Sequence, residues 1–239
     1  MAEMVSVALP VYNGAQYLAE QLESILNQLE PMDEVVAAYQ QCGDASLEIL
    51  QSFQQRDQRV KIYVNQQTGV TANFNLAIAK CTGDYIFISD QDDVWLPNKR
   101  TRVVAALKES GADLVVHNAV HTDAELNPQE HNFFEIYPIG PGVWHNIVKP
   151  RMSGCCMAFT RAYQKKLLPL PEIYGYDQWV NVLAECCGTV VYLEDVLLLH
   201  RLHGDNVTTP TRALPVVLKC RAKLFWSLAL RLIRIRWKG

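Results

Sequence analysis

The fold is decided by residues 85–95, which read YIFISDQDDVW. The first four are aromatic or β-branched, an apolar run typical of a buried strand in a parallel sheet. Three carboxylates follow at once, at Asp90, Asp92 and Asp93. Ligands of open α/β sheets bind beyond the carboxyl ends of the strands, where Asp90 and Asp92 can face one cation. The stretch therefore predicts a metal site, although an acidic turn in which Asp93 caps a helix starting at Pro97 has the same composition.

Strands and helices alternate on the amino-terminal side of this stretch. Apolar runs and turn residues predict strands at 5–11, 34–39 and 60–64, and helices at about 16–28, around 47–53 and at 69–80. Four strands alternating with three helices in ninety residues indicate a parallel sheet with right-handed crossovers.

The pattern is less regular on the carboxyl-terminal side. Residues 118–150 hold four prolines and two of the glycines, which predicts a long loop or hairpin over an active site. Around that segment the sequence predicts helices at 97–110 and 176–187 and strands at 113–117, 154–160 and 189–193.

Composition limits the possible compartments and partners. The chain has 239 residues, of which 49% are hydrophobic, enough to bury a core. Seven cysteines without metal-finger spacing and without a secretory signal favour a reducing cytoplasm. Residues 1–215 carry fifteen Lys and Arg against twenty-five Asp and Glu, which argues against nucleic acid as a partner. No apolar run approaches the roughly 20 residues that span a bilayer.

The last residues have the opposite charge. Residues 216–239 contain seven basic and no acidic side chains and predict an amphipathic helix. Such a helix is typical of attachment to an anionic membrane surface, whereas a terminal helix packed on the domain is the alternative. We expect a main domain at 1–212 and a basic tail at 213–239. The expected basic arc is Lys219, Lys223, Arg231, Arg234 and Lys238, with Leu218, Phe225, Leu228, Ala229, Leu232 and Ile235 largely elsewhere.

Five segments carry polar or small residues in a fixed order. They are VALPVYNG at 7–14, SDQDDVWLPNK at 89–99, GCCM at 154–157, YDQW at 176–179 and RLHGDN at 201–206. Together they resemble the motifs of the family 2 glycosyltransferases, including rhamnosyltransferase-like members that build bacterial O-antigen and capsule chains. The resemblance covers residues 4–209. It implies the GT-A fold, a Rossmann-like, mixed but mostly parallel sheet flanked by helices, here with an amphipathic carboxyl-terminal helix.

The resemblance also implies a divalent cation. Asp90 and Asp92 would hold Mn²⁺ or Mg²⁺, which oxygen ligands favour over zinc. His203 would complete the metal shell or contact the diphosphate, or else be a loop histidine in ordinary hydrogen bonding. Asp93 would support the metal ligands or cap the next helix. The cation would neutralise charge on the departing nucleoside diphosphate.

An inverting transfer also needs a base that accepts the proton of the acceptor hydroxyl. By position in the resemblance, this base is Asp177; alternatively, Asp177 is the N-cap of its helix. Gly154, Cys155 and Trp179 would line the acceptor side. Trp179 would stack on a sugar or belong to the core.

The implied contacts to the nucleotide sugar lie on several segments. Arg201 would make a forked contact with phosphate, and Asn73 would face the nucleotide or be an exposed helical residue. Similar enzymes carry an Asp-Asp-Gly-Ser-like turn after the second strand, where this chain has YQQCGD at 39–44. An amide, which can accept or donate a hydrogen bond, replaces a carboxylate there. A UDP- or dTDP-linked donor is still expected, but the identity of its nucleobase is left open. The full set is Pro10, Tyr12, Asn13, Gln40, Asn73, Asp90, Gln91 and Arg201.

The expected function is inverting, metal-dependent transfer of a sugar from a nucleoside-diphosphate donor to a saccharide acceptor. The acceptor would be lipid-diphosphate-linked, at the cytoplasmic face of the membrane, in synthesis of bacterial cell-surface polysaccharide. Loss of the acidic pair at 39–40 motivates one alternative, a non-catalytic subunit that binds a nucleotide or glycan. The other is a nucleotidyltransferase, which ordinarily shows a glycine-rich loop with a basic residue that Asn13 and Gly14 do not supply.

Overall fold

The computed structural model describes residues 3–148, 152–173, 175–204 and 214–237. The expected boundary at residue 212 and the end of the RLHGDN motif, Asp205 and Asn206, lie outside the described residues.

The amino-terminal half is the alternating unit that the sequence predicts. Strands β1, β2, β3 and β4 run parallel in the order β3-β2-β1-β4. The carboxyl ends of β1 and β4 therefore meet at one edge, where the acidic segment begins. The elements are β1 (Val5–Val11), α1 (Leu18–Leu26), β2 (Glu34–Gln40), α2 (Ser46–Arg56), β3 (Val60–Asn65), α3 (Val70–Lys80) and β4 (Tyr85–Ile88).

The second half extends the same sheet with mixed directions. The order continues from β4 as β8-β6-β9-β5, and β7 pairs with β6. Only β6 and β9 are parallel; the other pairs are antiparallel. The elements are β5 (Val94–Trp95), α4 (Lys99–Ser110), β6 (Leu114–Thr122), β7 (Pro128–Asn132), α5 (Phe133–Ile136), α6 (Val143–Val148), the 3₁₀ turn η1 (Gly154–Cys156), β8 (Met157–Thr160), α7 (Arg161–Leu167), α8 (Tyr176–Cys187), β9 (Val190–Arg201) and α9 (Leu214–Arg236).

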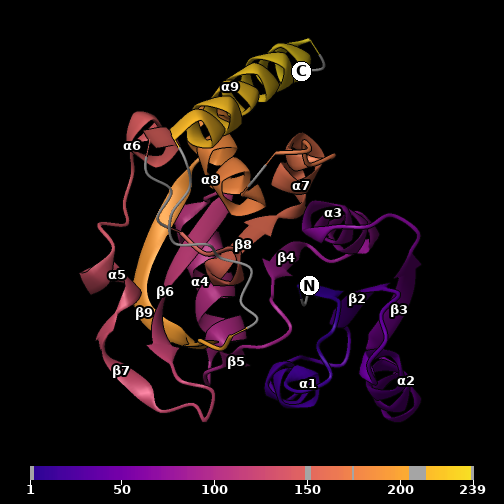
Figure 1. The fold of residues 1–239 in the computed structure, drawn as a ribbon. Helices are drawn as coiled ribbons and strands as arrows, with labels where there is room; N and C mark the ends of the chain where they lie inside the picture. Colours follow the sequence, from indigo (N-terminus) through magenta and orange to yellow (C-terminus); the bar gives the residue numbers. More distant parts are fainter. Residues whose placement is uncertain (1–2, 149–151, 174, 205–213, 238–239) are drawn as a thin grey trace.

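Helices cover both faces of the curved sheet (Figure 1). Residues of α1, α2 and α4 pack in one core cluster, and residues of α3, α7, α8 and α9 pack in the other. Successive strand residues point to opposite faces: Phe87 belongs to the first cluster, while Ile86 and Ile88 belong to the second. The expected mixed, mostly parallel sheet flanked by helices is confirmed.

The structure corrects several expected boundaries. Helix α4 begins at Lys99 after a left-handed Asn98, so Asp93 is not its cap. Residues 154–156 form a 3₁₀ turn rather than the start of a strand. Within the predicted loop or hairpin at 118–150, the end of β6 and strand β7 form an antiparallel pair, as expected for a hairpin, and two short helices follow. The extent of β6 and β7 depends on strand pairing, which local pattern does not encode.

Buried Glu34 ties the start of β2 to β1, to β3 and to the turn before β4. Its Oε1 accepts hydrogen bonds from Ser6 Oγ (2.6 Å) and from Thr82 N and Oγ1 (both 2.7 Å). Its Oε2 pairs with Lys61 Nζ at 2.5 Å. Burial alone would raise the pKa of Glu34, but the hydrogen bonds from Lys61, Ser6 and Thr82 outweigh it and hold the pKa below its ordinary value.

Glu34→Gln is expected to lower the free energy of unfolding by about 1–3 kcal/mol at pH 7, because hydrogen bonds to a buried charge are lost. A carboxylate with a lowered pKa stabilises the fold above its unfolded pKa, and that contribution is lost as pH falls through the folded pKa. Urea unfolding of both proteins should therefore converge in acid. The exposed Glu48→Gln is the control; an equal effect of both substitutions at pH 7 would contradict the assignment.

Candidate functional site

The acidic segment after β4 is held against α1. Gln21 is buried, and its Nε2 donates to Ser89 Oγ (2.7 Å) and to the Asp90 carbonyl (2.8 Å). Ser89 is buried as well, whereas Asp90 and Asp92 are half-buried. The carboxylates thus leave the sheet on a segment whose backbone is fixed, as a preformed site requires.

Asp92 meets the segment that follows β9. His203 Nε2 lies 3.0 Å from Asp92 Oδ2, and the His203 ring lies 4.9 Å from the Tyr17 ring. The two residues are 111 positions apart in sequence, and the sheet brings them together. Imidazole nitrogen and carboxylate oxygen are both ligands for Mn²⁺.

Negative charge accumulates around Asp90. Burial raises the pKa of Asp90 well above its ordinary value, and the charges of Asp93, Asp92 and Asp177 raise it further. Asp177, from the start of α8, therefore lies within electrostatic range of the acidic segment. A divalent cation would relieve this excess of charge, and the adjacent ligand atoms of Asp92 and His203 fit such an ion as a pair. Within the described chain, however, the ligand atoms of Asp90, Asp92 and His203 are not all within 4.8 Å of one another.

Gln91 fixes the loop after β1. Its Oε1 accepts from Tyr12 N, and its Nε2 donates to the Tyr12 carbonyl, both at 2.9 Å. Asn13 has a left-handed φ of 50°, and Pro10 lies at the carboxyl end of β1. A Cβ at Gly14 would lie 2.4 Å from Gln91 Oε1, so glycine is required for this approach. The exposed Tyr12 ring remains available to a ligand.

The ends of β2 and β3 are joined to α3. Gln40 Oε1 accepts from Gly69 N at 2.8 Å. Asn73 Oδ1 accepts from Asn65 Nδ2 at 2.7 Å, and Asn73 Nδ2 approaches the Val11 carbonyl at 3.5 Å. Asn73 is buried, so the alternative of an exposed helical asparagine is wrong.

A carboxylate that sequence reasoning missed occupies the loop at 39–44. Asp44 Oδ2 accepts from Ala15 N (2.9 Å), and Asp44 Oδ1 accepts from Ser46 N (3.1 Å). The buried Ser46 Oγ in turn accepts from Gly14 N at 2.8 Å. These bonds join the loop after β1 to the start of α2. Their only sequence signal is the Asp-X-Ser spacing typical of a local turn.

Arg201 is buried in a network of protein partners. Its Nε donates to the Asp92 carbonyl (2.9 Å), its Nη atoms donate to the Ala124 carbonyl and to Glu20, and its guanidinium lies 4.4 Å from the Tyr17 ring. The side chain holds the end of β9 on the acidic segment. Its forked contact with phosphate stays a prediction.

One predicted acceptor contact, that of Trp179, is wrong. Trp179 is fully buried, with 0% exposure, among α7, α8 and α9 side chains, so it cannot stack on a sugar. Asp177 lies in the first turn of α8, where its Oδ1 accepts from Gln178 N at 2.8 Å, and Gly175 is the N-cap. The alternative of Asp177 as N-cap is wrong, while its role as base remains a prediction.

Gly154 allows Tyr176 to approach the sheet. A Cβ at Gly154 would lie 2.1 Å from Tyr176 Oη, and the Tyr176 ring stacks on Phe74 at 3.8 Å between centroids. The adjacent Cys155 is fully buried, and its carbonyl accepts from Lys99 Nζ at 2.9 Å. Both residues are therefore buried within the fold, and their contact with an acceptor stays a prediction.

Gly154→Ala is expected to destabilise the protein by about 1–3 kcal/mol, because the stacked Tyr176 ring must move to make room. Thermal unfolding measures the effect. Gly43→Ala is the matched control, since no atom lies within 4 Å of a Cβ there and no positive φ is present. Equal unfolding temperatures for Gly154→Ala and the parent protein would contradict the packing argument.

The sequence of this chain matches a known protein family. Residues 6–168 match the family described as Glycosyl transferase family 2. Glycosyltransferase GlyG of Streptococcus pneumoniae serotype 4 (strain TIGR4) is 33% identical over 124 residues, which are 52% of this chain and 41% of GlyG. The chain thus spans well under two thirds of that relative's length.

Two solved structures share the fold. Staphylococcus aureus TarS 1–349 in complex with UDP-GlcNAc superposes with a TM-score of 0.74 at 16% identity, covering 97% of this chain and 67% of TarS. The mannosyltransferase PcManGT of Pyrobaculum calidifontis, in complex with GDP-Man and Mn²⁺, gives a TM-score of 0.66 at 18% identity, covering 100% of this chain and 76% of PcManGT.

Proposed function

Because the chain belongs to glycosyl transferase family 2 and has the GT-A fold, we propose that it is a glycosyltransferase that uses a nucleoside-diphosphate sugar. The observation that carries the proposal is the contact of Asp92 with His203 beyond β4, with Asp177 in electrostatic range of Asp90. GlyG is named a glycosyltransferase, and TarS and PcManGT were solved with UDP- and GDP-sugars, which supports a donor of this class.

The proposed metal centre consists of Asp92 and His203, with Asp90 as a further ligand. Mn²⁺ or Mg²⁺ bound there supplies a Lewis acid for the charge that develops on the diphosphate. Mn²⁺ in the PcManGT complex supports this choice. Gln91 holds the Tyr12 backbone, and Arg201 holds the segment that carries His203, so both residues keep the donor side in position.

The proposed base, Asp177, would accept the proton of the acceptor hydroxyl and leave the anomeric carbon inverted. A base of this kind contributes about 10²–10⁴ in rate. The test is release of nucleoside diphosphate from a panel of UDP-, dTDP- and GDP-sugars with Mn²⁺ and saccharide acceptors. Acceptor-dependent release from one donor is expected; donor binding without any turnover across the panel would favour the non-catalytic alternative.

The carboxyl-terminal helix α9 supports the further proposal of membrane attachment. Its inner side packs on the domain through the buried Leu224 and Leu228. The sequence predicts that Arg231 lies on an open basic arc. In the structure its guanidinium instead donates to carbonyls of residues 166–169. Its outer side exposes Leu218, Phe225, Trp226, Leu230, Ile233 and Trp237.

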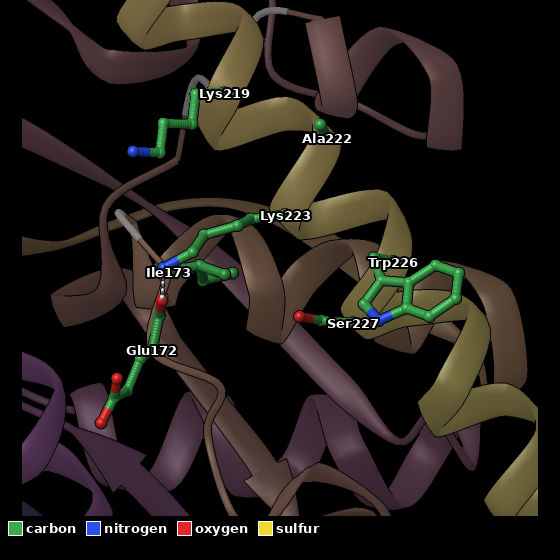
Figure 2. A pocket seen from close by; sticks show the side chains of 7 residues that line it. All are labelled: Glu172, Ile173, Lys219, Ala222, Lys223, Trp226 and Ser227. Carbon is green, nitrogen blue, oxygen red and sulfur yellow. Dashed lines mark hydrogen bonds between the residues drawn. The ribbon is translucent and has the colours of Figure 1, made fainter.

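Basic side chains accompany these exposed apolar ones. Lys219, Lys223 and Trp226 line a shallow groove of about 500 Å³ between α9 and residues 172–173 (Figure 2). Aromatic and basic side chains together are typical of helices that lie in an anionic membrane interface. In the described part of the chain, no helix combines the length and the hydropathy needed to cross a bilayer. We propose attachment to the inner membrane face, where a lipid-linked saccharide of cell-surface polysaccharide would be the acceptor.

The double variant Trp226→Gln, Ile233→Gln is expected to lose most binding to phosphatidylglycerol vesicles, because both side chains are exposed and would enter the interface. Cosedimentation with anionic and zwitterionic vesicles measures this. Val64→Gln removes an exposed apolar residue from β3 and serves as the control. Binding unchanged by the double variant, or equal for both lipids, would contradict membrane attachment through α9.

A further inference from the structure

A second cluster of ligand-type side chains lies beside the acidic segment. Asp93 follows β4, Cys155 is in η1, and His200 is near the end of β9. One ligand atom from each lies within 4.8 Å of the other two, and no other such group of three or more His, Cys, Asp or Glu occurs in the described part of the chain. None of the three is a predicted ligand of the donor metal.

The Asp93 carboxylate is incompletely satisfied. Asp93 is 1% exposed; its Oδ1 accepts from Arg201 N at 3.2 Å, while its Oδ2 accepts no hydrogen bond from the described residues. Burial raises the pKa of Asp93, whereas the charge of His200 and a hydrogen bond from the Cys155 thiol lower it. A buried carboxylate oxygen without a good donor is costly, and a cation would satisfy it.

Two polar groups, Lys99 and Ser153, contact Cys155. The buried Lys99 ammonium is directed to the Cys155 carbonyl (2.9 Å) and lies 4.5 Å from the Trp95 ring. Ser153 Oγ lies 3.1 Å from Cys155 Sγ, so its hydroxyl can donate to a thiolate. Burial nevertheless raises the pKa of the Cys155 thiol, so the bound cation itself would have to stabilise the thiolate.

His200 is oriented by a chain of partners on its other side. His121 Nδ1 lies 3.3 Å from His200 Nδ1, and His121 Nε2 lies 3.1 Å from Tyr137 Oη. Metal-binding histidines are commonly held in this way, with the ring fixed by a hydrogen bond to its second nitrogen.

We propose that Asp93, Cys155 and His200 bind Zn²⁺ at a structural centre separate from the proposed Asp92 and His203 donor site. Thiolate, imidazole and carboxylate are ligands that zinc prefers, whereas Mg²⁺ and Mn²⁺ prefer oxygen. Binding releases the Cys155 thiol proton, and the thiolate and carboxylate then balance the two charges of the ion. Water completes the tetrahedron. The centre ties β4, η1 and β9 together behind the donor site.

Cobalt substitution of the full chain tests the proposal, because a thiolate ligand gives Co²⁺ an intense near-ultraviolet charge-transfer band. The chelator-treated protein is titrated with Co²⁺ and then with Zn²⁺. We expect the thiolate band to saturate at one Co²⁺ per chain and to disappear when Zn²⁺ displaces that ion. Absence of the band in the folded parent protein would overturn the proposal.

Variants locate the ion. Cys155→Ser is expected to abolish the band, and Cys156→Ser, which changes the neighbouring buried thiol, to keep it. His121→Phe removes the partner of His200 and should weaken cobalt binding about 10–100-fold. Asp92→Asn should leave the band intact. If Cys155→Ser does not fold, His200→Gln replaces it. A band that survives loss of Cys155 or His200, or disappears with Cys156 alone, contradicts the proposed ligands.

Discussion

Asp92→Asn is expected to weaken Mn²⁺-dependent binding of the nucleotide sugar by about 100-fold or more, because the substitution removes a charged ligand while keeping the shape of the side chain. The structure motivates this size of effect: Asp92 Oδ2 lies 3.0 Å from His203 Nε2, and burial with neighbouring carboxylates already raises the pKa of Asp90. Without Asp92, the remaining groups carry too little negative charge to hold the divalent cation.

Isothermal calorimetry with and without Mn²⁺ measures this loss. The control is Asp195→Asn, whose carboxylate pairs with Arg102 at the surface, 2.9 Å away, and which should bind donor as the parent protein does. Parent-like, Mn²⁺-dependent binding by Asp92→Asn would show that the metal is held elsewhere.

Asp177→Asn is expected to reduce the transfer rate by about 10²–10⁴, since an amide cannot accept the proton of the acceptor hydroxyl. Donor binding should change only a few-fold, because the amide keeps the size and shape of the side chain and Asp92 and His203 are unchanged. The helix itself should remain intact: Gly175, not Asp177, is the N-cap of α8. The separation of rate from binding distinguishes a base from a structural residue.

Steady-state rates of acceptor-dependent diphosphate release measure the effect of Asp177→Asn, with calorimetry for the donor. Glu172→Gln provides a matched exposed carboxylate on the segment that precedes α8. A transfer rate within a few-fold of the parent protein would rule out Asp177 as the base.

The sequence predicts the parallel half of the fold well because its strands are long apolar runs that alternate with helices. Strand β4 and helix α8 have the expected bounds. The two-residue strand β5 exists only through its pairing with Leu198 and Leu199 of β9, so no local pattern could reveal it. Helix α7 was not predicted, although Thr160 before it is a typical N-cap residue.

The part of the site that lies within one segment of the sequence was predictable. Two aspartates after an apolar strand indicated metal binding, but the approach of His203 to Asp92 depends on the sheet order. Trp179 was wrong as an acceptor contact because an aromatic residue on a buried helical face has the same sequence signature as one in a sugar site. The roles of Gln21 and Asp44 depend on contacts with loops distant in sequence.

The central claim is that acidic side chains at the end of β4 gather the cation that serves the donor diphosphate. Crystals of the protein with Mn²⁺ and a bound nucleoside-diphosphate sugar test it through the anomalous signal of manganese. A single strong peak is expected within bonding distance of Asp92 and of the diphosphate oxygens, next to His203. A manganese peak remote from both Asp90 and Asp92, with the nucleotide bound, would contradict it.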